Sequence, residues 1–139
     1  MKKILLISFT LICLSSVFLT ASKTYNISES QVNAIENKYG SGAKIRIEQW
    51  DSMIQTSRNE PLLNQIKNVN DFFNELTYKT DLMHWKKKDY WATPFEFIGT
   101  GAGDCEDYAI AKYFSLIKLG IPEDKLRITY VIYQKANSR

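Results

Sequence analysis

The most informative part of the 139-residue sequence is an octapeptide that ends a glycine-rich run: Gly101-Ala102-Gly103-Asp104-Cys105-Glu106-Asp107-Tyr108. Glycines leave the backbone free to bend sharply, and the residues that follow predict a helix over 105–119, ended by Gly120 and Pro122. After its first turn this helix has a single polar stripe, made of Lys112, Ser115 and Lys118. A helix with so narrow a polar face is expected to be buried on most sides.

Cys105 is predicted to lie in the first turn of this helix. The helix dipole and the unpaired N–H groups at that end favour a thiolate. The same N–H groups can bind the oxyanion that develops during acyl transfer. The position therefore indicates a nucleophile, while a small buried residue without a chemical role is an equally open interpretation.

Three carboxylates, those of Asp104, Glu106 and Asp107, flank the cysteine and oppose the thiolate. Each costs ~1 kcal/mol at 4 Å in water and ~4 kcal/mol at an effective dielectric of 20, against a dipole effect of ~0.3–2 kcal/mol. A divalent cation would reverse this balance, and hard oxygen ligands suit Ca²⁺. We expect Asp104, Glu106 and Asp107 to bind Ca²⁺. The alternative is that Asp104 caps the helix, with Asp107 as its partner and Glu106 merely favoured in the first turn.

A cysteine nucleophile normally needs a histidine base. The only histidine is His84, in a polar stretch upstream, and nothing in the pattern directs it toward Cys105. A surface or loop role is the better interpretation of His84. Trp85 and Trp91 are expected to pack in the core, with a place in a substrate cleft as the alternative.

The first half of the sequence predicts a layer of helices. A short helix is capped by Ser28 or Ser30, runs to Lys38 and ends at Gly40. Two amphipathic helices follow, the second opened by Asn59 and Pro61. Their apolar faces comprise Ala43, Ile47, Trp50 and Ile54 in one and Leu62, Ile66, Val69, Phe73 and Leu76 in the other.

Strands are predicted only in the second half. Residues 77–81 form a short extended segment, Thr93 and Pro94 begin a brief helix through Ile98, and alternation over 126–133 predicts a strand. One clear strand and one doubtful strand do not make a stable sheet. We therefore expect an α+β fold with a helical N-terminal half and an incomplete C-terminal β-sheet.

The N-terminus has the pattern of a secretory signal peptide over 1–22: Lys2 and Lys3, then an apolar run, then Ala21 and Ser22. The run is shorter than the ~20 residues of a membrane span, although a retained anchor is an alternative. Without the leader, 16 basic residues would face 15 acidic ones, and Cys105 would be the only cysteine. We expect an exported protein with no stable membrane span, and no nucleic-acid partner because no basic patch is present.

Four segments resemble the bacterial transglutaminase-like cysteine proteinases: residues 69–74, 89–94, 101–113 and 126–131. The resemblance implies a papain-like α+β fold and a Cys-His-Asp triad with Cys105 as nucleophile. It also implies calcium binding in the region of Asp104, Glu106 and Asp107. Family members of the adhesin-cleaving type act in the periplasm on a surface adhesin, which releases cells from biofilms. An inner-membrane receptor for cyclic di-GMP sequesters them.

The sequence departs from the family pattern at its C-terminal end. The resemblance places the catalytic His shortly after the strand at 126–131 and the Asp further on, but the sequence ends at Arg139 before either. We expect residues 23–139 to form a domain truncated before these two residues, inactive or nearly so. The alternatives are a non-catalytic module that binds calcium or a partner, and a thiol-linked protein that dimerises through Cys105.

Overall fold

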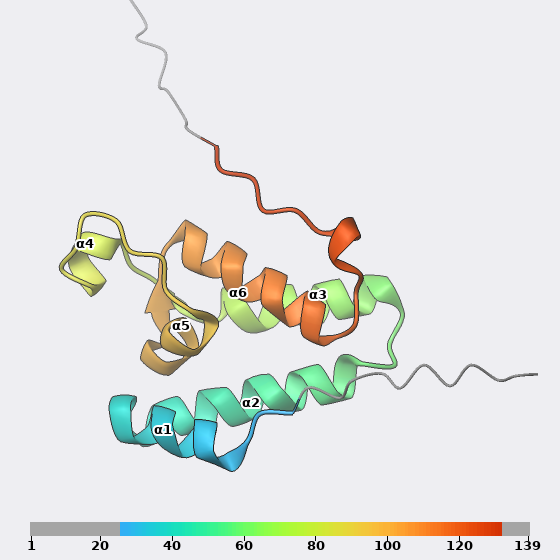
Figure 1. Ribbon diagram of the computed structural model, residues 1–139, viewed down its shortest axis with the longest axis horizontal. Coiled ribbons are helices and arrows are strands. Elements are labelled where there is room, and N and C mark those ends of the chain that lie inside the picture. Colours follow the sequence, from blue (N-terminus) through green and yellow to red (C-terminus); the bar gives the residue numbers. More distant parts are fainter. Residues whose placement is uncertain (1–25, 132–139) are drawn as a thin grey trace, which may run out of the picture.

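The computed structural model describes residues 26–131, and the predicted signal peptide over 1–22 lies outside them. Helices and two short strands build an α+β fold, so the predicted class is confirmed (Figure 1). The elements are α1 Glu29–Tyr39, α2 Ser41–Ser57, α3 Leu62–Asn74, β1 Thr77–Tyr78, α4 Asp81–His84, α5 Pro94–Thr100, β2 Ala102–Gly103, α6 Cys105–Lys118 and a 3₁₀ turn at Glu123–Lys125. Among the described helices, none is long and apolar enough to cross a membrane.

The ends of α1 follow local sequence signals. Ser28 is the N-cap: its Oγ accepts the Gln31 N–H at 3.3 Å, and the Gln31 side chain accepts the Ser28 N–H at 3.0 Å. The helix ends at Gly40, whose φ of 87° lies in the left-handed region that favours glycine. Helix α2 begins at the next residue.

The core is built around the predicted apolar face of α2. Ala43, Ile47, Trp50 and Ile54 are all buried, as expected. The prediction for α3 is right only in its second half: Val69 and Phe73 are buried, but Leu62 and Ile66 are 51% and 43% exposed. Helix α3 packs on α2 and α6, and these contacts bury the later turns of its apolar stripe.

Helix α5 is fastened to α2 through its last carbonyl groups. Arg46 on α2 donates from Nε to the Ile98 carbonyl at 2.6 Å and from Nη2 to the Gly99 carbonyl. A cationic donor at a helix C-terminus satisfies carbonyls that have no partner within the helix. Gly99 also permits a close approach to α1, because a Cβ at this position would lie 2.6 Å from Cδ2 of Tyr39.

Helix α6 is less buried than the sequence predicts. It packs on α3 and α5, with Ala111, Ser115 and Leu119 buried, while Phe114 is 48% exposed. Ser115 does not belong to a solvent-facing stripe: its Oγ accepts the Trp50 indole N–H at 2.8 Å and donates to the Ala111 carbonyl at 2.7 Å. A hydroxyl that finds partners inside the protein can be buried in an otherwise apolar contact.

The sheet of the described residues consists of β1 and β2, paired in parallel with Thr77 opposite Ala102 and Tyr78 opposite Gly103. The predicted strand at 77–81 is therefore shorter than expected, and Asp81 begins α4 instead. The predicted strand at 126–133 is wrong for residues 126–131, which form no ladder and run beside α6 as an irregular segment (Figure 1); residues 132 and 133 lie outside the described residues. A strand is stabilised by pairing with a neighbouring strand, and none lies beside this segment within residues 26–131.

Candidate active site and cation site

Cys105 is the first residue of α6. The N-cap of this helix, Asp104, directly follows the last residue of β2. Its side chain is exposed and forms no disulfide, so the alternative of a small buried residue is wrong. The tight approach before it depends on Gly103, where a Cβ would collide with Asp107 Oδ2 and lie 2.8 Å from Cδ2 of Phe97.

The thiol of Cys105 donates a hydrogen bond to Oε2 of Glu106 at 2.9 Å. This bond and then burial raise the pKa of the Cys105 thiol, and the charges of Glu106 and Asp104 act in the same direction. The acidic neighbours therefore outweigh the start of the helix and oppose formation of the thiolate.

Asp81 is a third buried carboxylate beside the predicted ligands Asp104 and Asp107. Asp81 is 4% exposed, and its carboxylate lies with those of Asp104 and Asp107 in a group whose ligand atoms are all within 4.8 Å of one another. The Asp81 N–H donates to Asp104 Oδ2, and the Asp104 N–H donates to Asp107 Oδ2, both at 3.3 Å. Asp104 thus has the predicted capping position and is at the same time part of a carboxylate cluster.

The three predicted calcium ligands do not form a single group in the structure. Asp104 and Asp107 group with Asp81, whereas Glu106 groups either with Asp104 and Cys105 or with Asp81 and Asp89. Asp81 and Asp89 have no local signal in the sequence. Asp81 follows β1 as Asp104 follows β2, and the carboxyl ends of paired parallel strands meet at the same edge, so a correct prediction of this pairing would have found Asp81.

The buried cluster favours a cation. Burial, followed by the hydrogen bond with Glu106 and its charge, raises the pKa of Asp104 to about 7. Burial also raises the pKa of Asp107, although the Ala92 N–H at 2.7 Å and the Asp104 N–H oppose this. Oδ1 of Asp81 and Oδ1 of Asp104 are buried without a hydrogen-bond partner. Unpartnered carboxylate oxygens in a negative site are the ligands that a hard divalent cation requires.

His84 is not placed as a base for Cys105 among the described residues. It lies in α4 with its ring 4.5 Å from that of Trp85, and its Nε2 is buried without a hydrogen-bond partner. The hydrogen bond of the Cys105 thiol goes to Glu106. Because His84 lies in the helix α4 and is half-buried, the surface or loop role expected for it is wrong.

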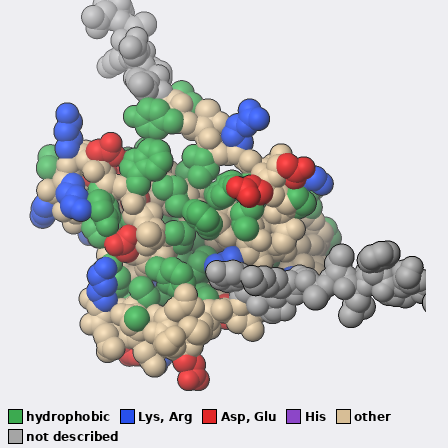
Figure 2. Space-filling model, in the orientation of Figure 1, with side chains coloured by type: hydrophobic (Ala, Val, Ile, Leu, Met, Phe, Trp, Pro, Cys, Tyr) green, Lys and Arg blue, Asp and Glu red, His purple; other side chains and the backbone are tan. Residues whose placement is uncertain are grey.

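Two hollows share Trp91 and Ile110, and Cys105 lines the smaller one. A cavity of ≈ 260 Å³ has Cys105, Trp91 and Ile110 in its wall, together with residues 128–131. A larger one of ≈ 820 Å³ shares Trp91 and Ile110 and continues past Phe114. Hydrophobic side chains gather over α6 on this face (Figure 2). Trp91 is 53% exposed and lines both hollows, so its expected core position is wrong and the cleft alternative fits.

Known proteins share this arrangement of sequence and fold. The sequence model of the bacterial transglutaminase-like cysteine proteinases matches residues 43–139. LapG of Legionella pneumophila is 38% identical, with a TM-score of 0.59 over 71% of this chain and 55% of that one. EGTA-treated LapG gives the same identity and TM-score over 71% and 53% of the two chains. Calcium-bound LapG gives 39% identity and a TM-score of 0.58 over 70% and 54%.

The chain thus spans about half the length of the LapG chains it matches. None of the curated proteins compared with the chain matches it. The structural matches confirm the transglutaminase-like α+β fold expected from the sequence.

Proposed function

We propose that this chain, which belongs to the bacterial transglutaminase-like cysteine proteinase family, supplies the nucleophile and the calcium site of a cysteine endopeptidase. The observation that carries the proposal is the position of Cys105. Its exposed thiol lies at the start of α6, within 4.8 Å of carboxylate oxygens of Asp104 and Glu106, and in the wall of the hollow beside Trp91. A nucleophile, acidic ligands and space for a peptide are therefore adjacent.

The reaction begins with attack of the Cys105 sulfur on a peptide carbonyl carbon. The new C–S bond gives a tetrahedral oxyanion, which N–H groups at the start of α6 can stabilise. Cleavage of the C–N bond releases the amine and leaves a thioester, which water hydrolyses. A base must carry the thiol proton to the leaving amine, and His84, the only histidine of the sequence, packs on Trp85 instead. We therefore expect the 139-residue chain alone to be inactive or nearly so.

Asp81, Asp104 and Asp107, with Glu106 beside them, are the residues that would hold Ca²⁺. When bound, the ion supplies positive charge that offsets these carboxylates and favours the thiolate form of the neighbouring cysteine. The unpartnered Oδ1 atoms of Asp81 and Asp104 support this assignment, as does the calcium-bound state of the similar LapG chain.

The substrate, partner and cell compartment follow from the family resemblance and from the leader pattern of residues 1–22. We propose export to the periplasm, a surface adhesin as protein substrate and a cyclic di-GMP receptor of the inner membrane as partner. The hollow beside Cys105 is lined by Trp91, Ile110 and residues 128–131. An apolar hollow of this kind suits an extended segment of a protein substrate.

Calcium-dependent alkylation of Cys105 tests the proposal on the chain as it is. Iodoacetamide labelling, followed by mass spectrometry, is expected to be faster in calcium chloride than in EGTA, and to disappear in Cys105→Ser. Asp81→Asn is the matched control because it removes a cluster carboxylate and leaves the thiol; its labelling rate should not respond to calcium. An unchanged rate in the wild-type chain on adding calcium would overturn the calcium-dependent mechanism.

A non-catalytic module that binds calcium or a partner protein is the second candidate. The observation that favours it is the position of His84, which leaves Cys105 without a base among the described residues. Pull-down of adhesin or receptor fragments by the Cys105→Ser chain separates the two candidates. Binding together with calcium-independent alkylation of the wild-type thiol would favour the non-catalytic module.

A further inference from the structure

The segment between α4 and α5 covers the buried acidic cluster with its backbone. The Tyr90 N–H donates to Asp81 Oδ2 at 2.5 Å, and the Ala92 N–H donates to Asp107 Oδ1 at 2.7 Å. Asp81 and Asp107 are 4% and 0% exposed. The position of this segment therefore sets the orientation of both carboxylates, and it leaves Oδ1 of Asp81 free for a cation.

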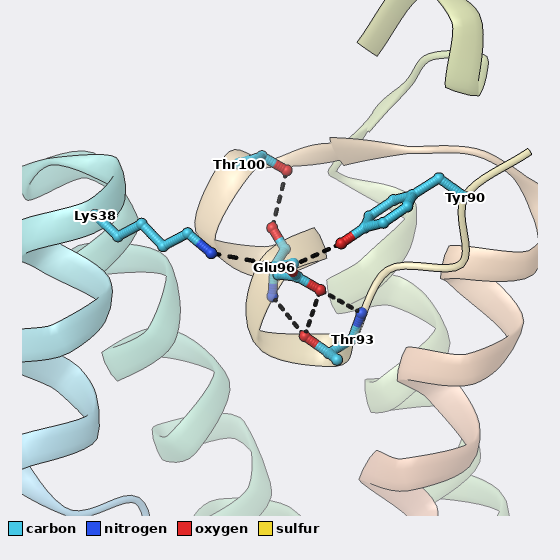
Figure 3. Close-up of polar contacts among 5 residues, drawn as sticks. All are labelled: Lys38, Tyr90, Thr93, Glu96 and Thr100. Carbon is cyan, nitrogen blue, oxygen red and sulfur yellow. Dashed lines mark hydrogen bonds and ion pairs between the residues drawn. The ribbon is translucent and has the colours of Figure 1, made fainter. Parts of the chain in front are cut away.

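Residues 86–93 have no helix or strand of their own to hold them in place. A single carboxylate, that of Glu96 on α5, binds both ends of the part that covers the cluster (Figure 3). Glu96 Oε1 accepts the Tyr90 hydroxyl at 3.0 Å. Glu96 Oε2 accepts the Thr93 N–H at 3.0 Å and the Thr93 hydroxyl at 2.9 Å. Lys38 of α1 adds an ion pair with Oε1 at 3.8 Å.

We propose that Glu96 is a positioning residue for the cation site, acting through the Tyr90 hydroxyl to hold the Tyr90 N–H against Asp81. The proposal rests on the proposed function, because it assumes that the acidic cluster binds calcium. Glu96 does not touch the cation. It restricts the covering segment, so that Asp81 presents its unpartnered oxygen to the ion without a loss of conformational freedom on binding.

A purely structural role for Glu96 makes a different prediction. Glu96 also forms the capping box of α5 with Thr93, and loss of a cap lowers stability without a specific effect on calcium. Tyr90→Phe separates the roles, because it removes the hydroxyl that links Glu96 to the covering segment and leaves the capping box intact. Thr100→Val is the matched control: it also deletes a hydroxyl bonded to Glu96, but that bond goes to the backbone carbonyl at 2.9 Å.

Calorimetric titration of the full 139-residue chain with calcium chloride tests the inference. Tyr90→Phe and Glu96→Ala are each expected to weaken calcium binding about tenfold, the lower end of the effect of residues that orient metal ligands. The double variant should lose no more calcium affinity than the single variant that binds calcium more weakly, because both substitutions break the same hydrogen-bond link. Thr100→Val should bind calcium as the wild-type chain does. If Glu96→Ala fails to fold by circular dichroism, Tyr90→Phe carries the test.

The outcomes separate this inference from the proposed function. Wild-type binding of calcium with unchanged affinity in Tyr90→Phe overturns the role of Glu96 and leaves the calcium site standing. Losses that simply add in the double variant also overturn it, since the two residues would then act independently. A wild-type chain that binds no calcium overturns both proposals.

Discussion

Replacing Ser115 by alanine should destabilise the protein through one buried hydrogen bond. The Trp50 indole N–H donates to Ser115 Oγ at 2.8 Å, and the two side chains are 1% and 0% exposed. Ser115→Ala leaves that N–H without an acceptor in the core, which costs ~1–3 kcal/mol. Alanine recovers about 0.5 kcal/mol through its higher helix propensity. The expected net loss in the free energy of unfolding is therefore about 0.5–2.5 kcal/mol.

Ser52→Ala is the matched control for helix propensity. Ser52 also lies in a helix, but it is exposed, so its replacement should bring only the gain of about 0.5 kcal/mol. The difference between the two variants isolates the buried bond at ~1–3 kcal/mol. Urea unfolding followed by far-UV circular dichroism measures both free energies, and equal slopes of the transition would show that the variants expose similar surface.

Equal stability of Ser115→Ala and Ser52→Ala would refute this reasoning. The Trp50 N–H would then have an acceptor or a water molecule that replaces the hydroxyl at no cost. The result matters for the site as well, because the Trp50–Ser115 bond joins α2 to α6, the helix that begins at Cys105.

Three further variants test the electrostatics and packing of the site. Burial opposes ionisation of Glu96, but hydrogen bonds from Thr93 and Tyr90 lower its pKa below the ordinary 4.5. The stability that the Glu96 carboxylate adds, relative to Glu96→Gln, should be complete above pH 4.5 and should disappear as the pH falls through the lower pKa of the folded state. Urea unfolding at a series of pH values measures this difference. Glu106→Gln removes the negative charge beside the Cys105 thiol and leaves a weaker, neutral acceptor for its hydrogen bond, so the pKa of the thiol should fall and alkylation in EGTA should begin at lower pH than in the wild-type chain. Gly103→Ala places a Cβ against Asp107 Oδ2 and should cost ~1–3 kcal/mol in urea unfolding, with weaker calcium binding by calorimetry.

These predictions have contrary outcomes that are easy to recognise. A stability difference for Glu96→Gln that persists unchanged at low pH would show that its charge does not contribute. An unshifted alkylation profile in Glu106→Gln would remove the thiol–carboxylate bond from the account. Gly42→Ala is the control for Gly103→Ala, because its Cβ would meet only Nη1 of Arg46 at 3.4 Å; a similar loss in both variants would contradict the argument from close packing.

Several helix boundaries were predictable because they depend on neighbours in the sequence, but the N-cap of α3 is Pro61 and not the expected Asn59, and α4 was not predicted. Ser28 and Gly40 begin and end α1, Thr93 begins α5, and Asp104 is the N-cap before Cys105. Caps and left-handed glycines act over three or four residues, so no tertiary contact is needed to recognise them. The same holds for the buried face of α2, whose spacing follows from the helical repeat.

Burial and pairing were harder to predict. The alternation over 126–131 is that of a strand, but the segment lies unpaired because strand formation depends on a partner. Ser115 has the spacing of a solvent-facing position, yet it is buried because its partner Trp50, 65 positions away, supplies a donor. Neither outcome can be derived from the residues next to each position.

The amino-acid order alone therefore determined both ends of α1 and the starts of α5 and α6, and that a lone thiol with acidic neighbours opens α6, since such features arise between residues a turn or less apart. Only the tertiary structure decided which groups surround that thiol. The parallel pairing of β1 with β2 brings Asp81 to Asp104 across 23 positions, and Glu96 holds the covering segment through Tyr90. These contacts depend on how separate elements pack, which local patterns do not encode.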